Sequence, residues 1–309
     1  MRFAAAPDID LSGLGVRIGD VEVTRVEDYH GLGMPGTAMF PAVQPHMWEE
    51  HADWLVPQFY DPATKRLRTS IHSWLVKTPR HNILVDACIG NHKNRPDDPR
   101  FHMRTEPWLE RLVAAGSHPD AIDFVMCTHF HADHVGWNTQ LVDGRWVPTF
   151  RNARYLFKRA EFDRWDDRRP DHVPRDSQRF VFADSVLPVV ESGQAVMVDD
   201  GYTLDERLTV EPAPGHTPGN ITIRLRTAGE QALFCGDVIH HPVQLPYPEV
   251  CSVFDDDPVA GLATRLRMLD DVAASGTLLL PTHFAAPFCC GIHAVGGARH
   301  SYRPLWPVA

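Results

Sequence analysis

The sequence predicts an α+β fold with two sheet-and-helix halves, and three observations support this class. Short apolar runs with the two-residue period of strands are interspersed with stretches that have the period of amphipathic helices. Residues 83–86 (ILVD) and 233–237 (LFCGD) are similar apolar strands that each end in an aspartate, which hints at an internal duplication. Nothing between the two halves has the composition of a linker, so we expect one domain over residues 1–309.

Composition and charge narrow the classes of protein to be considered. The chain has 309 residues, of which 43% are hydrophobic and 23% charged, so it can bury a core and is not globally disordered. Its net charge of −10 repels phosphate backbones and disfavours nucleic acid as a partner. No stretch approaches the roughly 18 to 20 consecutive apolar residues of a membrane span. The first residues lack the apolar core of a secretion signal, so we expect a cytoplasmic protein without a membrane partner.

The first half of the chain begins with predicted strands. Residues 16–27 alternate apolar and polar side chains, which is the strand period. Residues 28–70 are rich in His, Pro, Met and aromatic residues without clean periodicity, and we interpret them as a covering segment that could roof a pocket. Residues 1–70 would therefore hold an N-terminal strand and this covering segment. Residues 71–78 and 83–88 are predicted to pair as strands across a short turn.

A helix and a buried strand are predicted next. Residues 105–116 have the pattern of a helix, with Thr105 as the N-cap and Gly116 as the stop. Residues 122–127 are a short apolar run, typical of a buried strand, that ends at a polar cluster. The mixed charge run at 163–179 indicates a solvated loop or helix face.

The second half of the chain again has short strands and one amphipathic helix in its predicted pattern. Residues 208–213, 221–226 and 231–235 are predicted as three consecutive strands, and residues 277–280 as another short buried strand. Residues 259–275 have the pattern of an amphipathic helix between them. Its expected inward-facing residues are Leu262, Leu266, Leu269 and Val272.

The most informative cluster follows the strand at 122–127. It runs Thr128-His129-Phe130-His131-Ala132-Asp133-His134, with three imidazoles and one carboxylate within six residues. Packing alone does not explain such a cluster at the end of a buried strand, and imidazole is a preferred ligand of zinc. His129 and His131, two residues apart in an extended turn, can face one ion. Asp133 and His134 would then face a neighbouring position.

Four ligands from one loop are too few for two ions, so further ligands must come from distant parts of the chain. Three candidates follow or lie beside predicted strand ends, where a turn can aim a side chain into a shared cleft. They are His216 in Pro-Gly-His-Thr-Pro-Gly, Asp237 in Cys-Gly-Asp-Val and His283 in Pro-Thr-His-Phe.

Together these motifs resemble those of the metallo-β-lactamase-fold hydrolases, in the order of that family and over residues 71–284. The resemblance implies a four-layer αββα sandwich, in which two mixed β-sheets pack face to face with helices outside. It also implies two divalent metal ions, with Zn²⁺ expected. One ion would be held by His129, His131 and His216, the other by Asp133, His134 and His283, and Asp237 would bridge them.

Two aspartates receive further roles from this resemblance. Asp86 ends the strand ILVD at a position that, in this family, lies behind the metal histidines, where it could orient a ligand by accepting its other N–H. A simple turn aspartate is the alternative. Asp133 could orient a metal-bridging hydroxide and pass its proton to the leaving group. The chain has no G-x-S-x-G elbow, so the implied reaction is metal-assisted hydrolysis by direct attack of hydroxide.

Sub-patterns of the family narrow the reaction further. True β-lactamases usually lack the bridging Asp, flavodiiron proteins replace the second His of the motif with Glu, RNA-processing members favour a basic surface, and glyoxalase-II-type thioesterases carry a C-terminal helical region. This chain departs from all four. The segment 28–70, Trp137 directly after DHVG, HHPVQ at 240–244 and FDDDP at 254–258 resemble the lactonase and methyl parathion hydrolase-like branch.

We therefore expect a small lactone or carboxylic-ester substrate that is cleaved by hydrolysis. The alternatives are an organophosphate triester hydrolase and, from a different class, a metal-binding redox or sensor module without a hydrolytic role. A homodimer is one option for the assembly. The candidates for the substrate pocket are Trp137, His240, His241 and Phe284, and an ordinary structural role is the alternative for each.

Overall fold

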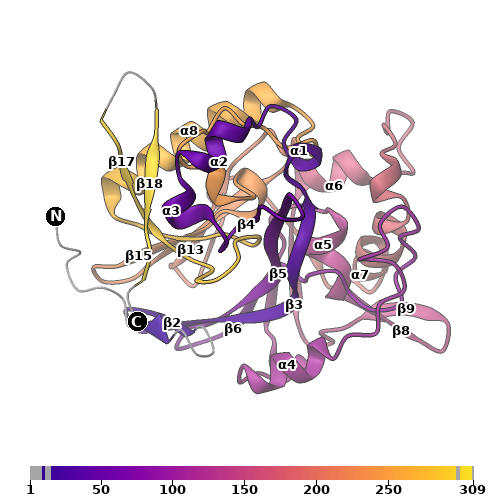
Figure 1. Cartoon of the computed structure of the whole chain (residues 1–309). Coiled ribbons are helices and arrows are strands. Elements are labelled where there is room, and N and C mark those ends of the chain that lie inside the picture. The colour runs from indigo at the N-terminus through magenta and orange to yellow at the C-terminus, as the bar shows by residue number, and fades with distance from the viewer. Residues whose placement is uncertain (1–8, 11–14, 297–299, 308–309) are drawn as a thin grey trace.

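Two β-sheets pack face to face, with helices on their outer faces, in the computed structural model, which describes residues 9–10, 15–296 and 300–307 (Figure 1). Within those residues, the larger sheet has nine strands and the smaller has five. The predicted α+β sandwich is thereby confirmed. None of the described helices is long and apolar enough to cross a membrane.

The larger sheet is antiparallel at its N-terminal end and parallel at the other. Its strands are β1 (Ile9–Asp10), β2 (Gly15–Ile18), β3 (Val21–Pro35), β4 (Tyr60–Asp61), β5 (Arg66–Lys77), β6 (Asn82–Val85), β7 (Phe124–Met126), β10 (Arg154–Lys158) and β11 (Ala195–Val198). Their order in the sheet is β1-β2-β3-β5-β6-β7-β10-β11, and β4 pairs with β5. Because β6, β7, β10 and β11 run parallel, their carboxyl ends meet at one edge of the sheet.

The smaller sheet contains the three consecutive strands predicted for the second half. Its strands are β12 (Thr203–Leu204), β13 (Leu208–Pro212), β14 (Ile221–Arg226), β15 (Gln231–Phe234) and β16 (Leu278–Leu280), in that order across the sheet. Strands β12 to β15 are antiparallel. The chain then passes through α8 (Pro258–Ser275) and returns as β16, parallel to β15.

The sheets have apolar side chains on both faces, so they pack against each other on one face and against helices on the other, which gives four layers. Val23, Trp74 and Leu156 of the larger sheet and Val210 and Ile223 of the smaller one belong to a single buried cluster between the sheets. The opposite face of the larger sheet is covered by α4 (Trp108–Ala114) and α7 (Leu187–Glu191), and that of the smaller sheet by α8. Figure 1 shows α4 and α8 on opposite sides of the two sheets. Burial of these apolar faces provides the main driving force for the fold.

The remaining elements lie around this sandwich. They are α1 (Gly36–Met39), α2 (Pro45–Glu49), α3 (Ala52–Leu55), α5 (Ala132–Val135), α6 (Arg159–Trp165) and the hairpins β8 (Thr139–Val142) with β9 (Arg145–Pro148) and β17 (Gly291–Ala294) with β18 (Tyr302–Leu305). The helices α1 to α3 belong to residues 36–59, which pack Phe40, Trp48 and Phe59 against Val243.

Three sequence predictions need correction. The strand predicted over 16–27 is two strands that reverse at Gly19, where φ is 58°. The helix predicted over 105–116 begins at Trp108, with Pro107 as its N-cap, because a residue before proline is disfavoured in helical conformation. The segment predicted as irregular over 28–70 is shorter, because β3 continues to Pro35 and β5 begins at Arg66.

The inward face of α8 also differs from the prediction. Leu269 and Val272 are buried as expected, but Leu262 and Leu266 are only half-buried. Gly261 is buried in their place, because the first turns of the helix lie against the turn that precedes β14. This close approach brings α8 next to the candidate site.

Candidate metal centre

Strand ends at one edge of the sandwich position the residues that the motifs singled out. The loop 128–134 follows β7 directly, Asp237 follows β15, and His283 follows β16. His216 lies in the turn between β13 and β14. Segments that are far apart in sequence therefore end at the same edge.

Two glycines let these loops approach one another closely. Gly215 has a φ of 136° and lies against the backbone of Gly261, so that a Cβ on it would collide with α8. Gly236 has a φ of 47°, and a Cβ on it would clash with the Thr128 side chain. At both positions the backbone conformation and the lack of space require glycine. The turns that carry His216 and the residue after Gly236 depend on this freedom.

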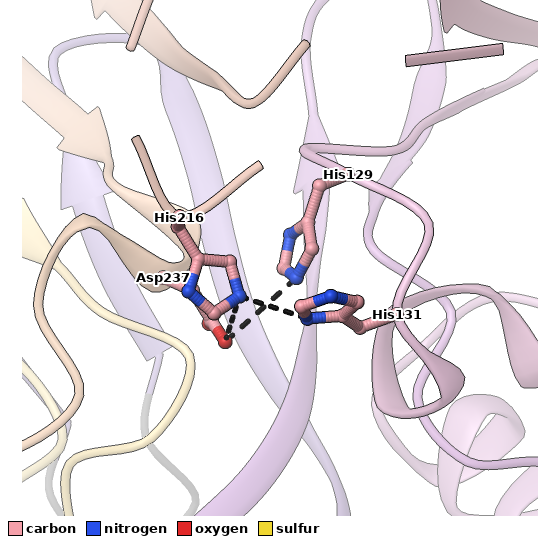
Figure 2. A group of neighbouring side chains, drawn as sticks. All are labelled: His129, His131, His216 and Asp237. Atoms are coloured by element: carbon pink, nitrogen blue, oxygen red, sulfur yellow. Dashed lines mark hydrogen bonds and ion pairs between the residues drawn. The ribbon is translucent and has the colours of Figure 1, made fainter. Parts of the chain in front are cut away.

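The first group of side chains consists of His129, His131, His216 and Asp237, all of them buried, with ligand atoms within 4.8 Å of one another. Nε2 of His216 lies 2.8 Å from Nδ1 of His131. Oδ2 of Asp237 lies 3.3 Å from Nε2 of His216 and 3.7 Å from Nε2 of His129. Figure 2 shows the three rings and the carboxylate pointing toward one another, with His129 and His131 on one segment and His216 and Asp237 on two others.

The second group consists of Asp133, His134 and His283, again within 4.8 Å of one another. Oδ1 of Asp237 faces this group, at 3.2 Å from Nε2 of His134 and 3.0 Å from Nε2 of His283. The carboxylate oxygens of Asp133 lie 3.9 Å and 3.7 Å from the same two nitrogens. Asp237 thus directs one oxygen to each group and stands between them.

Hydrogen bonds on the outer side of the imidazole rings determine which ring nitrogen carries a proton and which can bind a metal. Nδ1 of His283 donates to the carbonyl oxygen of Ser70 at 3.1 Å, because a carbonyl oxygen can only accept. Nδ1 of His134 and Nδ1 of His216 likewise donate to Asp86 at 2.9 Å and to Asp255 at 3.0 Å. When these rings are neutral, as metal binding requires, their Nε2 atoms carry lone pairs that point inward.

Lone pairs that converge on a carboxylate in a buried space require a cation. Nε2 of His129, Nε2 of His134 and Oδ1 of Asp237 are buried and have no hydrogen-bond partner within the described part of the chain. Leaving such atoms buried and unpaired is costly. A donor set of imidazole nitrogens and carboxylate oxygens suits Zn²⁺ and similar divalent ions, so the residues fit metal ions.

Asp86 lies directly behind this set. Its backbone adopts a φ of 57°, and its Oδ1 accepts the backbone N–H of Thr128 at 2.7 Å. The Thr128 hydroxyl, in turn, lies 3.1 Å from Nδ1 of His129. Asp86 therefore contacts His134 directly and reaches His129 through one side chain, which orients two of the rings.

Electrostatics divide the imidazoles into two kinds. Burial opposes a charge on His134, but the carboxylates of Asp237, Asp86 and Asp133 outweigh it and raise the pKa of His134 well above its ordinary value. Burial, reinforced by the neighbouring imidazole of His134, holds the pKa of His129 well below its ordinary value. Burial opposes ionisation of Asp237, but the imidazoles around it, first His283, hold its pKa well below its usual range. The carboxylate of Asp237 is thus ionised, which is the state that metal binding needs.

A cavity of about 450 Å³ opens over this centre. Asp133, Asp237 and His283 form part of its floor. Its wall comes from strands β3 and β5, the short helix α1 and several loops. It includes the apolar residues Met34, Met39, Leu67, Ile71, Phe101 and Phe254 and the arginines Arg66, Arg95, Arg100 and Arg179. The arrangement can bind a small molecule with apolar parts directly over the paired groups.

Two of the four pocket candidates line this cavity. His240 is buried, its Nε2 lies 3.2 Å from Oδ2 of Asp237, and neither ring nitrogen has a hydrogen-bond partner among the described residues. The ring of His241 is already used, because its Nε2 donates to the carbonyl oxygen of Phe59 at 2.9 Å and its Nδ1 accepts the N–H of Val243 at 3.1 Å. His240 is therefore the one of the two that is free to bind a ligand.

The other two candidates do not line the cavity. Trp137 stacks on Trp108 at 5.3 Å between ring centroids, inside the core next to α4. It turns away because the preceding Gly136 lies against the backbone of Ile89, where a Cβ would collide. Phe284 is fully buried and packs against Phe59 at 6.4 Å between ring centroids. Both are core residues.

Sequence reasoning missed several residues of the site. Asp255, which binds His216, stands in a run of three aspartates, and nothing in that run distinguishes it from Asp256 and Asp257. Phe101 lies in a loop without periodicity, so no pattern indicated that it would reach the cavity. Glu161 lies in a short helix and looks like an ordinary surface residue in the sequence.

A comparison with protein-family profiles identifies the family of the chain. A profile of the metallo-β-lactamase superfamily matches residues 67–281, which is more than half of the chain. A comparison with curated protein sequences found no match.

Solved structures of similar shape include a hydrolase, a lactonase and the protein AiiA. The hydrolase AbOPH of the β-lactamase superfamily has a TM-score of 0.77 at 24% identity, over 96% of this chain and 97% of that one. AidC, a dizinc quorum-quenching lactonase, has a TM-score of 0.75 at 20% identity, over 96% and 98%. A mutant of AiiA from B. thuringiensis, solved with N-decanoyl-L-homoserine at its active site, has a TM-score of 0.58 at 16% identity, over 84% and 92%. At these identities, the likeness shows the fold alone.

Proposed function

Because the chain belongs to the metallo-β-lactamase superfamily of hydrolases, we propose that it is a dinuclear metal-dependent enzyme that cleaves a lactone or a carboxylic ester. The observation that carries this proposal is the place of Asp237, whose two oxygens face two separate groups of ligand atoms. One ion would need only one of these groups. A carboxylate between two groups is the arrangement expected for a bridge between two ions.

The ligand sets assign each residue a role. His129, His131 and His216 would hold the first ion, Asp133, His134 and His283 the second, and Asp237 both; we propose Zn²⁺ for both. When bound, such ions supply a hydroxide at neutral pH and polarise the carbonyl oxygen of the substrate.

Asp133 is the residue that we propose for proton transfer. Its side chain is 17% exposed, against 9% or less for His283 and Asp237, and it lines the cavity. A carboxylate oxygen of Asp133 can therefore take up a proton and pass it to the leaving-group oxygen when the acyl C–O bond breaks. In a lactone, this oxygen stays attached, so that the product is a hydroxy acid.

His240 would bind a polar group of the substrate. Its ring lines the cavity with Nε2 at 3.2 Å from Oδ2 of Asp237, and neither nitrogen has a hydrogen-bond partner among the described residues. Burying an unpaired imidazole is costly, and a substrate oxygen that accepts its N–H would remove this cost. His240 would thus orient the scissile group relative to Asp133.

The cavity wall favours an ester with an apolar acyl part. Met34, Met39, Leu67, Phe101 and Phe254 all line the cavity, which gives an apolar surface for hydrocarbon. The lactonase AidC, a neighbour in shape, was solved with the product N-hexanoyl-L-homoserine, which has such a part. This likeness supports the choice of a lactone but rests on the fold.

A substrate panel tests the proposal. The purified, metal-loaded protein would be assayed with lactones, aryl esters, phosphotriesters and a β-lactam, and kcat/KM compared. We expect the highest values for lactones or carboxylic esters. Faster hydrolysis of a phosphotriester would favour the organophosphate reaction instead, and a metal-loaded protein that hydrolyses none of the panel would contradict an ester or lactone hydrolase.

A further inference from the structure

Glu161 is a fully buried carboxylate next to the candidate centre that none of the proposed steps uses. It lies in the first turn of α6 and has no exposed surface. Among the residues that the structure describes, no Lys, Arg or His nitrogen forms an ion pair with it, and its contacts are three neutral donors. A buried, unpaired carboxylate is costly, so its position calls for an explanation.

The three donors come from different segments. Oε1 of Glu161 accepts the backbone N–H of Phe130 at 2.9 Å and the indole N–H of Trp165 at 2.6 Å. Oε2 accepts the hydroxyl of Thr217 at 2.6 Å. All three bonds are buried, and those to an ionised acceptor are among the stronger hydrogen bonds.

Two of these donors are immediate neighbours of the first group of ligands. Phe130 stands between His129 and His131, and Thr217 follows His216. One carboxylate therefore links the loop after β7 to the turn between β13 and β14. These are the two segments that must be held at a fixed spacing for three imidazoles to meet at one point.

Packing contacts of α6 also hold the loop after β7 and the turn of His216 at a fixed distance from each other. A Cβ on Gly219, in the turn after His216, would collide with the backbone of Glu161, so this turn lies directly on the start of α6. The ring of Trp165 packs edge-on against His131, at 5.4 Å between centroids. The start of α6 thus contacts both segments through backbone, ring and carboxylate.

The second group has no such contact with Glu161. His134 is held by Asp86 and His283 by the carbonyl oxygen of Ser70. Loss of the Glu161 carboxylate should therefore act on one group of ligands and leave the other in place.

We propose that Glu161 is a positioning residue that sets the spacing of His216 from the pair His129 and His131, and with it the metal affinity of the first group. The inference rests on the proposed dinuclear function. Outer residues of this kind typically change metal affinity by about 10- to 100-fold when they are replaced.

Metal binding, without any activity assay, tests the inference. The full chain would be loaded with Zn²⁺, dialysed against a competing chelator and analysed for zinc, as the parent and as four variants. Glu161→Ala removes all three bonds, Thr217→Val removes only the link to the turn of His216, and Glu161→Gln keeps an acceptor for Phe130 and Trp165. Tyr155→Phe is the control, because it removes buried bonds to Asn138 and Phe150 that do not involve the centre.

We expect about two equivalents of zinc in the parent, Tyr155→Phe and Glu161→Gln, and about one in Glu161→Ala. Thr217→Val should lose one equivalent at a chelator concentration about 10-fold or more below that which affects the parent. If Glu161→Ala fails to fold, Thr217→Val carries the test alone. Parental affinity of both variants would overturn the inference, and so would a Glu161→Gln protein that loses zinc like Glu161→Ala, because charge rather than spacing would then govern binding. A parent that binds no zinc would instead contradict the proposed function.

Discussion

The floor and the wall of the cavity are built in different ways. The floor, formed by Asp133, Asp237 and His283, consists of side chains in the segments that follow β7, β15 and β16. The wall combines residues of strands β3 and β5 with residues of short helices and loops, such as Met39 and Phe101. The loop residues of the wall can change without moving the strand ends behind the floor, which separates the chemistry from the choice of substrate.

The contacts behind each region explain this difference. Three rings of the centre are fixed from outside by Asp86, Asp255 and the carbonyl of Ser70. Phe101, in contrast, is only partly buried, and the guanidinium of Arg100 lies over its ring at 5.2 Å. Loops tolerate exchange of residues better than strand ends do, so changes in the loop residues of the wall should shift specificity and changes in the floor should abolish the reaction.

The largest effect is expected from His131→Ala. Removing an imidazole from the first group should reduce turnover of every substrate to near background and lower the Tm, because bound metal stabilises the folded state. The zinc content and the Tm of the variant would be measured with its activity. A variant that keeps substantial turnover would contradict the assignment of His131 to the metal centre.

The second-largest loss of activity is expected from Asp133→Asn, which should affect proton transfer and not metal binding. Asp133→Asn keeps the size and one oxygen but removes the base, so kcat should fall by about 10²-fold or more while much of the metal is retained. The loss should be smaller for nitrophenyl esters, whose leaving group departs without a proton, than for aliphatic lactones. Equal losses on both substrate types that follow the metal content would show that Asp133 is only a ligand.

A change in the wall should act on binding alone. Phe101→Ala should raise KM for esters with long acyl chains by roughly 10-fold, with little change in kcat or in zinc content, because it removes apolar contact made equally before and during the reaction. Phe101→Leu, which keeps much of the apolar surface, is the control and should stay near the parent. A loss of kcat without a change in KM would show that wall and floor are not separable.

The smallest effect on activity is expected at the base of the wall. Nζ of Lys93 donates to Thr139 and to the carbonyl oxygen of Asp184, and Asp184 also binds Arg95 of the wall. Burial lowers the pKa of Lys93 from 10.5 to about 7, although Asp184 opposes the shift. Between these values the unfolded chain binds a proton that the folded protein has released, so the contribution of Lys93 to stability rises with pH above 7.

Thermal unfolding of the parent and of Lys93→Met between pH 6 and pH 9 would check this sign. The advantage of the parent over the variant should grow with pH, by on the order of 1–2 kcal/mol between pH 7 and pH 9, and kcat should change little. A difference that is constant or that shrinks toward high pH would mean that Lys93 stays charged in the folded protein.

The floor could be predicted from the sequence much better than the wall. The cluster His129 to His134 is recognisable because its ligands lie within six residues, and the strands before and after it have regular patterns. His216, Asp237 and His283 were singled out by their places near strand ends, and the structure brings them to the same edge. Their division into two groups came from the resemblance, not from spacing.

The wall and the outer contacts depend on tertiary structure that no local pattern encodes. Trp137 follows the motif directly but turns into the core because of the backbone contact of Gly136. The parallel strands β10 and β11 were not predicted; β10 pairs with β7, and β11 pairs with β10. The burial of Glu161 depends on two loops that are far apart in sequence, at Phe130 and Thr217.

The count of metal ions per folded chain tests the central claim most directly. The protein would be purified after growth with supplied zinc and examined by elemental analysis together with an independent protein determination. Two groups of three ligands that share Asp237 predict about two equivalents of metal. One equivalent or less in a folded protein would contradict the dinuclear centre.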